Sequence, residues 1–323
     1  MHPSQALFQD QTAPVLLPVC DHYAGSEKLM KKSMDLQQTL GPVFDITFDC
    51  EDGAASGDEA AHAMLVATML NSDGNRFNRI GVRVHHPSHP AFEQDLATIV
   101  SGAATRIAYL VLPKIQHADE VLQAISRIRH YTPAACGRSI PVHVLIETHH
   151  ALAEAMAIAA IPEVECLSFG VMDFVSAHYG AIPGSAMRSP EQFSHPLVVR
   201  AKLEIAAACH RYGKVPSHNV TTEIGDGEAA GNDARQAHRQ FGYTRMWSIH
   251  PLQIRAIIDN MAPDHQEVAD ACAILLAAQA SQWGPIQYQG HLHDKASYRY
   301  YWTILKRAQL SAIPLPEAAT DLL

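Results

Sequence analysis

Short apolar runs of β type alternate with longer helical patterns along most of the 323-residue chain, and this alternation limits the folds that the chain can adopt. An alternating pattern of this kind favours parallel strands joined by helical crossovers. The eight runs are Val15–Val19, Val43–Phe48, Ile80–Val84, Ile107–Leu112, Val142–Ile146, Cys166–Phe169, Lys214–Val220 and Tyr243–Ile249. Eight units in roughly 250 residues fit a closed (β/α)8 TIM barrel better than an open doubly wound sheet, which remains the alternative.

The segments between and after these runs carry helical signals. Residues 117–131 repeat apolar side chains at helical spacing, and residues 149–160 are rich in Ala and Leu without Gly or Pro. Beyond the eighth run, helical patterns continue over residues 251–261, 265–282 and 295–310. We therefore predict two parts, which are a (β/α)8 barrel catalytic domain over residues 1–262 and a C-terminal helical extension and lid over residues 263–323.

Composition excludes several classes of protein. The chain has 24 Lys and Arg against 33 Asp and Glu, a formal net charge of −9, which argues against binding to nucleic acid. Without an uncharged run of 18 or more apolar residues, we expect no membrane span. The six cysteines form no CxxC pair, which is typical of reduced thiols in a cytoplasmic protein. No GxGxxG, Walker-type or GxSxG motif is present, so the common nucleotide-binding and serine-hydrolase classes are not indicated.

Charged and polar residues follow most of the predicted strands. Barrel enzymes carry their chemistry at the carboxyl ends of the strands, so these residues are candidates for a site. In chain order they are Asp49, Glu51, Asp52, Arg83, His85, His86, Lys114, Glu147, Asp173, Ser217, His218 and His250. One rim of the barrel would therefore gather carboxylates, an arginine, a lysine and histidines, which is the outline of a site for a metal and an anion.

Glu147 and Asp173 are the candidate metal ligands. They are 26 residues apart, about one strand-to-strand repeat, and would lie on adjacent strands at the same height. Two carboxylates with water in the other positions suit Mg²⁺, which prefers oxygen ligands. The alternative for Glu147 is a role at the N-terminus of the helix that follows it, where negative charge is favourable. The neighbouring histidines suit a transition metal, but no HExxH motif is present.

Arg83 and Lys114 are the candidate cationic residues. A guanidinium can bind a substrate carboxylate or enolate oxygen through two parallel hydrogen bonds. An ion pair between Arg83 and the carboxylates of the Glu51-Asp52 segment is the alternative, and the two roles do not exclude each other. For Lys114, a charge partner is favoured over a Schiff-base residue.

Six blocks occur in the order FDITFDCEDG, GVRVH, LVLPKIQHADEV, VLIETHHALAEA, LSFGVMDF and FGYTRMWSIHPLQI. Over residues 15 to 260 the chain resembles the citrate lyase beta-subunit-like proteins of the HpcH/HpaI aldolase and malyl-CoA lyase superfamily. The segment QGHLHDKASYRYYWTILKRA resembles the closing segment of that family. The resemblance implies a (β/α)8 barrel, a homo-oligomer (trimer or hexamer), Mg²⁺ as cofactor, and C–C bond chemistry on CoA or acyl-carrier thioesters.

The resemblance also implies roles for individual residues. Glu147 and Asp173 match the metal-binding carboxylates, and Arg83 matches the arginine that holds the carboxylate-bearing substrate. Asp294 lines up with an aspartate that in some members enters the active site of a neighbouring subunit. Four features depart from the family pattern: Ala13-Pro14 replaces Arg-Ser, Arg83-Val84-His85 replaces Arg-x-Asn, Thr244-Arg245 replaces Gly-Lys, and GDEAAHA lacks the basic residues that follow the acidic block. The metal and oxo-acid site is therefore implied more strongly than the CoA cradle.

We expect a Mg²⁺-dependent carbon–carbon lyase of the retro-aldol or Claisen type. Its substrate would be a small 3-hydroxy acid or its thioester, and it would release or use a 2-oxo acid such as oxaloacetate or glyoxylate. Arg83 and Asp294 are the predicted catalytic residues, and Arg83, Glu51 and Asp52 are the predicted substrate-binding residues. The alternatives are a metal-dependent acyl-thioester hydrolase on the same barrel and a non-catalytic oxo-acid-binding homologue.

Overall fold

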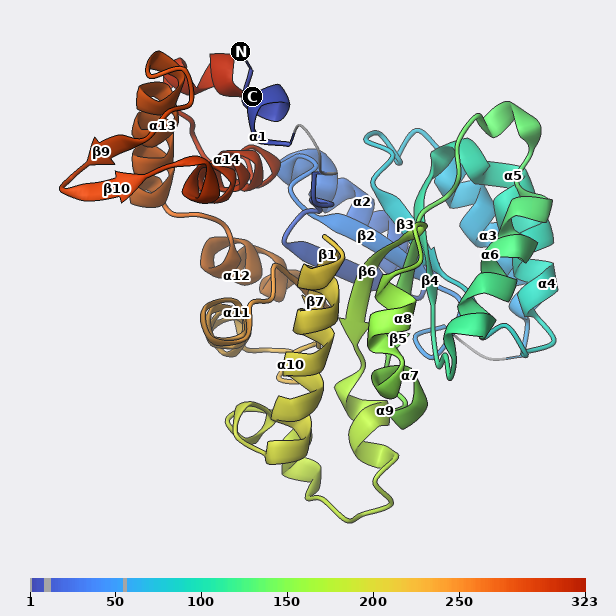
Figure 1. Cartoon of the computed structure of the whole chain (residues 1–323). Coiled ribbons are helices and arrows are strands. Elements are labelled where there is room, and N and C mark those ends of the chain that lie inside the picture. The colour runs from blue at the N-terminus through green and yellow to red at the C-terminus, as the bar shows by residue number, and fades with distance from the viewer. Residues whose placement is uncertain (1, 9–12, 55–56) are drawn as a thin grey trace. The chain divides into compact units, whose positions relative to one another are not determined.

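The computed structural model describes residues 2–8, 13–54 and 57–323 (Figure 1). The chain forms two compact units, of which one is Val19–Asn260 and the other combines Met1–Pro18 with Met261–Leu323. The predicted barrel domain began at residue 1, whereas the described residues before Val19 group with the C-terminal helices. The reason is apolar packing, because Ala6 and Leu7 belong to the same buried cluster as Leu305.

Unit Val19–Asn260 is built on eight parallel strands that close in chain order, with β8 paired to β1. The strands are β1 Cys20–Ala24, β2 Asp45–Asp49, β3 Ile80–Arg83, β4 Ile107–Leu112, β5 Val142–Ile146, β6 Val164–Phe169, β7 Val215–His218 and β8 Arg245–Ser248. The predicted (β/α)8 barrel is confirmed. All the predicted strands except the first overlap a strand of the structure.

The strand predicted over residues 15–19 is wrong, because β1 begins immediately after that run. Pro18 has no N–H to donate to a neighbouring strand, which disfavours the run as part of a central ladder. The true strand carries a buried carboxylate instead of an apolar pattern. Asp21 accepts hydrogen bonds from the Thr47 hydroxyl at 2.7 Å and from the Tyr109 hydroxyl at 2.9 Å. A strand that buries a paired carboxylate inside the barrel has no apolar run to mark it.

Helices surround the strands of this unit (Figure 1). They are α2 Glu27–Leu40, α3 Glu59–Asn71, α4 Phe92–Asp95, the π-helix η1 Leu96–Val100, α5 Ser101–Ala103, α6 Ala118–Tyr131, α7 His149–Ala153, α8 Ala155–Ala159, α9 Val171–Ser176, α10 Pro196–Arg211, α11 Gly227–Phe241 and α12 Pro251–Met261. The prediction over residues 117–131 is confirmed by α6. The single helix predicted over residues 149–160 is instead two short helices that meet at Glu154.

The barrel interior is layered, since inward-facing residues recur every second position along a strand. One layer is polar: the fully buried Arg245 lies 3.0 Å from Asp21 and 2.7 Å from Asp45. Two residues further along β1 and β8, Tyr23 and Trp247 belong to a buried apolar cluster. The other buried members of that cluster are Tyr109, Val111, Leu145 and Val220. This cluster lies nearer the carboxyl ends of the strands, where the candidate site begins.

The second unit contains α1 Pro3–Leu7, α13 His265–Ala280 and α14 Lys295–Leu310, with a hairpin of β9 Ile286–Tyr288 and β10 His291–His293 between the two long helices. The helices predicted over residues 265–282 and 295–310 are confirmed, and the hairpin was not predicted. Tyr298 and Trp302 are buried in the core of this second unit, whereas Tyr300 is 57% exposed. The aromatic segment of α14 therefore faces more than one direction, as expected from 100° per residue.

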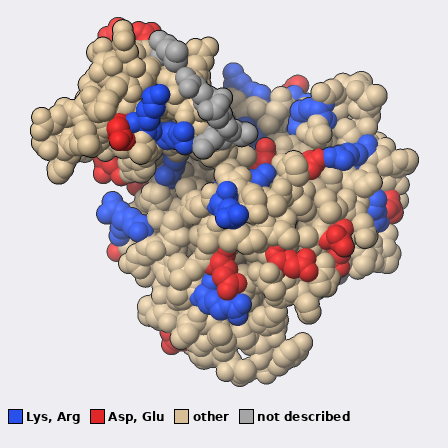
Figure 2. Space-filling view, viewed as in Figure 1, with Lys and Arg blue, Asp and Glu red and all other residues tan. Residues whose placement is uncertain are grey.

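None of the described helices combines the length and the apolar character needed to span a membrane. On the face drawn in Figure 2, Lys and Arg side chains lie dispersed among acidic and uncharged ones.

Candidate active site

A cavity of about 530 Å³ is lined by residues at and just beyond the carboxyl ends of the barrel strands. Of the sequence-predicted site residues, Asp49, Asp52, Arg83, Glu147 and Asp173 line it. Glu51 lines a neighbouring hollow of about 280 Å³, together with Asp52, His85, His86 and Lys114. The structure therefore brings most of the predicted strand-end residues to one end of the barrel, as parallel strands require.

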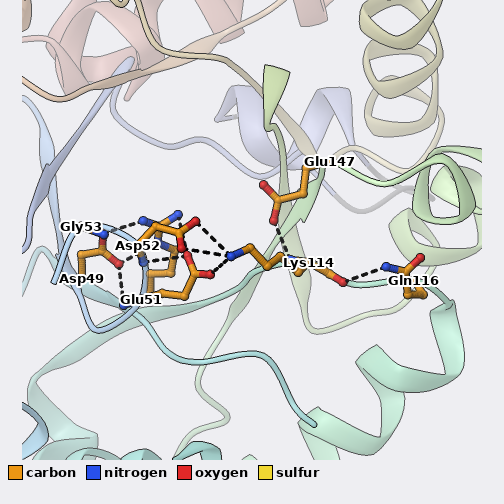
Figure 3. A network of polar contacts seen from close by, with 8 residues as sticks. Asp49, Glu51, Asp52, Gly53, Lys114, Gln116 and Glu147 are labelled. Atoms are coloured by element: carbon orange, nitrogen blue, oxygen red, sulfur yellow. Dashed lines mark hydrogen bonds and ion pairs between the residues drawn. The ribbon is translucent and has the colours of Figure 1, made fainter. Parts of the chain in front are cut away.

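Glu147 directly follows β5 and is 4% exposed. Its Oε1 accepts a hydrogen bond of 2.6 Å from the backbone N–H of Lys114 (Figure 3). On its other side lies Gly170, where a Cβ atom would stand 2.3 Å from Glu147 Oε2. The N-cap of α7 is Thr148, whose hydroxyl accepts from Ala151 N–H at 3.0 Å. The capping role considered for Glu147 is thus taken by its neighbour, and the glutamate carboxylate lines the cavity.

Asp173 was predicted on the strand next to that of Glu147, but it lies beyond the end of that strand, in the first turn of α9 after β6, which pairs with β5. Burial, and secondly the charge of Asp173, raise the pKa of Glu147 to about 8. Two carboxylates that repel each other in this way can both ligate a divalent cation, whose positive charge would stabilise their ionised forms. In the described parts of the chain, no three His, Cys, Asp or Glu side chains converge as a metal-binding group. Glu147 and Asp173 would therefore be two ligands of a cation that keeps several waters, which fits Mg²⁺.

Arg83 is held by carboxylates. Its Nε and one terminal nitrogen lie 2.7 and 2.5 Å from the two carboxylate oxygens of Asp49, and its other terminal nitrogen lies 3.3 Å from Glu51. Burial alone would lower the pKa of Arg83, but the bonds to Asp49 outweigh it and raise the pKa. The ion pair considered in the sequence analysis is therefore present. Because Arg83 also lines the cavity, its contact with a substrate carboxylate stays a prediction.

Lys114 contacts both the Glu51-Asp52 segment and the candidate metal ligand Glu147. Its ammonium forms ion pairs with Glu51 and with Asp52, the latter at 3.0 Å, while its backbone N–H bonds Glu147. Figure 3 shows Lys114 between these two sets of carboxylates. Partial burial would lower the pKa of Lys114, but the bonds to Glu51 and Asp52 outweigh it and raise the pKa. A protonated amine is a charge partner and not a Schiff-base nucleophile, and the substrate-binding roles of Glu51 and Asp52 stay predictions.

The histidines at the strand ends have different hydrogen-bond partners. His85 Nδ1 lies 2.7 Å from Asp95, and this hydrogen bond raises the pKa of His85. His218 is fully buried, and its Nε2 lies 2.6 Å from Nζ of Lys202. Its neighbour Ser217 is also fully buried, inside the barrel wall.

Tyr23, Asn219 and Trp247 also line the cavity, and none of them was predicted from the sequence. Tyr23 and Trp247 lie within strands, where an aromatic residue reads as ordinary core. Their position in the strand could have indicated them. Tyr23 lies two residues after the buried Asp21, and Trp247 lies two residues after the buried Arg245, so each shares the inward face of its strand with a buried polar residue.

Asp294 belongs to the second unit, where it is the N-cap of α14. Its side chain accepts a hydrogen bond of 2.9 Å from Ala296 N–H, and Ser297 completes a capping box. Capping of α14 accounts for an aspartate at position 294, and the catalytic role of Asp294 stays a prediction.

Comparisons with known proteins agree with this geometry. A sequence profile described as HpcH/HpaI aldolase/citrate lyase matches residues 37–251. A crystal structure of a citrate lyase from Burkholderia xenovorans LB400 is 55% identical, with 100% of both chains covered and a TM-score of 0.86. An L-malyl-CoA/beta-methylmalyl-CoA lyase from Rhodobacter capsulatus is 27% identical over 284 residues, which are 83% of this chain and 88% of that relative.

A citrate lyase beta subunit from M. tuberculosis, complexed with oxaloacetate and magnesium, has a TM-score of 0.60 at 19% identity, with coverage of 76% of this chain and 98% of that one. This last likeness concerns the fold. The family profile spans most of the barrel, and the B. xenovorans structure is similar over the whole length. The chain belongs to the HpcH/HpaI aldolase/citrate lyase family.

Proposed function

We propose that this protein is a Mg²⁺-dependent carbon–carbon lyase that acts on a small 3-hydroxy acid or its thioester. It would release or use a 2-oxo acid such as oxaloacetate or glyoxylate. The observation that carries the proposal is the buried carboxylate of Glu147, with its raised pKa, beside Asp173 in a cavity at the strand ends. The names of the relatives, a malyl-CoA lyase and citrate lyases, support the reaction class, and the structure with oxaloacetate and magnesium supports the ligand class.

When bound, Mg²⁺ would stabilise negative charge as it develops on substrate oxygens. The residues of the chain have complementary tasks. Lys114 N–H orients the Glu147 carboxylate, and Asp49 holds the Arg83 guanidinium at the cavity wall, where its charge attracts an anionic substrate. In cleavage, a base takes the hydroxyl proton, the C–C bond breaks, and the electron pair leaves with the two-carbon unit as an enolate. We propose Asp294 as that base.

The metal site tests the proposal directly. Calorimetric titration of Mg²⁺ is expected to show one site in the wild type and a loss of affinity of more than about tenfold in Glu147→Gln. Glu204→Gln, on the exposed side of α10, is the matched control and should bind like the wild type. Equal Mg²⁺ binding by the wild type and Glu147→Gln would contradict the site.

Product analysis tests the reaction class. The enzyme is incubated with Mg²⁺ and either malyl-CoA or free hydroxy acids. A lyase produces a 2-oxo acid, which can be trapped as its hydrazone. Free CoA together with an intact four-carbon acid would indicate a thioester hydrolase, and Mg²⁺ and oxaloacetate binding without turnover of any substrate would indicate a binding homologue.

A further inference from the structure

Three polar atoms on residues that line the cavity have no hydrogen-bond partner among the described residues. They are the hydroxyl of Tyr23, the indole Nε1 of Trp247 and the amide oxygen Oδ1 of Asn219. Tyr23 and Trp247 are 8% exposed and Asn219 is 1% exposed. A buried polar group without a partner lowers stability, so three of them around one cavity require an explanation.

The three residues lie next to one another on the barrel wall. Tyr23 belongs to β1, Trp247 to β8, and Asn219 directly follows β7, and these three strands are consecutive in the closed barrel. The rings of Tyr23 and Trp247 stack with centroids 4.9 Å apart and planes 15° apart, and the guanidinium carbon of Arg83 lies 5.4 Å from the Tyr23 centroid. This stack restrains both rings, so their polar atoms are fixed before a ligand arrives.

The orientation of the Asn219 amide follows from a buried hydrogen-bond chain. The carboxylate of Asp233 accepts from Gln192 Nε2 at 3.0 Å, so Gln192 Oε1 must face the other way as an acceptor. That oxygen accepts from Lys202 Nζ and from Asn219 Nδ2, each at 2.9 Å. Asn219 Nδ2 also donates to Val220 O at 2.9 Å. Both amide hydrogens of Asn219 are therefore used, and its Oδ1 remains as an acceptor.

We propose that Tyr23, Trp247 and Asn219 form a substrate-recognition wall, with two donors for carboxylate or carbonyl oxygens and one acceptor for a hydroxyl. The ligand class that matches this set is a hydroxy acid. The inference rests on the proposed function, because it names the substrate class of the same cavity. These residues select the substrate and take no part in bond cleavage. Burial raises the pKa of Tyr23, so its hydroxyl stays protonated and acts as a donor.

The test uses changes that remove one polar group each: Tyr23→Phe deletes the hydroxyl alone, and Trp247→Phe deletes the indole N–H together with part of the ring. Tyr23→Phe and Trp247→Phe keep the stacked rings, and Tyr179→Phe, at a position 96% exposed, is the control. Binding of oxaloacetate, L-malate and succinate is measured by calorimetry on the full chain, with and without Mg²⁺. Each wall variant is expected to bind oxaloacetate and L-malate about tenfold more weakly or worse. The melting temperature of Tyr23→Phe should be unchanged or higher, since its deleted hydroxyl has no partner in the protein, whereas Trp247→Phe also removes buried ring atoms and should melt lower.

The Asn219 assignment is tested on the wild type, which avoids a variant that fails to fold. L-malate differs from succinate by one hydroxyl, so the wild type should bind L-malate about tenfold more tightly. Equal affinities for L-malate and succinate would overturn the role of Asn219.

The remaining outcomes separate this inference from the proposed function. If the wild type binds these acids with Mg²⁺ and both wall variants bind equally well, the wall is wrong and the proposed function stands. If binding is independent of Mg²⁺ but weakened in the variants, the wall is supported and the metal-dependent function is wrong. If the wild type binds none of the three acids, the proposed ligand class is wrong.

Discussion

Arg83 has two possible tasks, and its contacts determine how they can be separated. Both oxygens of Asp49 and one of Glu51 face its guanidinium, so Arg83→Lys would lose a two-point ion pair. We expect this variant to melt at a lower temperature. If Arg83 also holds the substrate, oxaloacetate binding should weaken by about 1.5–3 kcal/mol.

Calorimetry with oxaloacetate and a thermal melt check the Arg83 prediction together. Arg200→Lys, in an exposed pair with Glu204, is the control for the chemical change. A variant that melts earlier but binds oxaloacetate like the wild type would restrict Arg83 to a structural role.

His22 is expected to make the stability of the protein depend on pH. Burial, and secondly the charge of His250, lower the pKa of His22 to about 4. In the unfolded chain this pKa is about 6.5, so between pH 6.5 and 4 only the unfolded state binds the proton. The stability present above pH 6.5 is therefore lost as the pH falls through this window, by up to about 3 kcal/mol from this one residue.

Denaturant unfolding at several pH values measures this effect. His22→Asn should show a flatter decline of the unfolding free energy between pH 6.5 and 4 than the wild type. Burial also lowers the pKa of His143 and His218, so the informative quantity is the difference between the two slopes. The exposed His265→Asn is the control, and identical slopes for the wild type and His22→Asn would refute the prediction.

At the scale of elements, the turn from β6 into α9 determines how closely backbone approaches Glu147. A Cβ at Gly170 would lie 2.3 Å from Oε2 and 2.5 Å from the Cβ of Glu147, so Gly170→Ala must displace that side chain. We expect the variant to lose Mg²⁺ affinity by about tenfold or more, because a displaced ligand no longer matches the cation geometry.

The control for this element is Gly184→Ala, where an added Cβ meets nothing within 4 Å. Magnesium titration and a thermal melt of both variants check the prediction. Unchanged Mg²⁺ affinity in Gly170→Ala would show that the Glu147 carboxylate does not depend on this close contact.

At the scale of the whole molecule, the prediction concerns a site completed by a second subunit. Glu147→Gln and Asp294→Asn are each expected to be inactive, and a mixture should regain activity after subunit exchange if Asp294 serves a neighbouring barrel. Asn is as good an N-cap as Asp, so Asp294→Asn should keep α14 intact. Exchange is checked by mass spectrometry of labelled subunits. No recovery after complete exchange would place the site within one subunit or exclude Asp294 from catalysis.

The sequence by itself determined the number of βα units, the carboxyl-end position of Glu147 and Asp173, and the family. The first two of these properties are local, because a buried parallel strand appears as an apolar run and the residues that follow it must lie at the rim of the barrel. The same logic failed for β1, whose buried Asp21 has partners on β2 and β4.

Only the tertiary structure decided which side chains meet across the barrel. The pairing of Arg83 with Asp49, the stack of Tyr23 on Trp247 and the oriented amide of Asn219 join residues that are far apart in the chain. Those contacts depend on the register in which eight strands close, and no local pattern encodes that register. Periodicity reports which face of a strand is buried, whereas barrel closure decides what each buried face contacts.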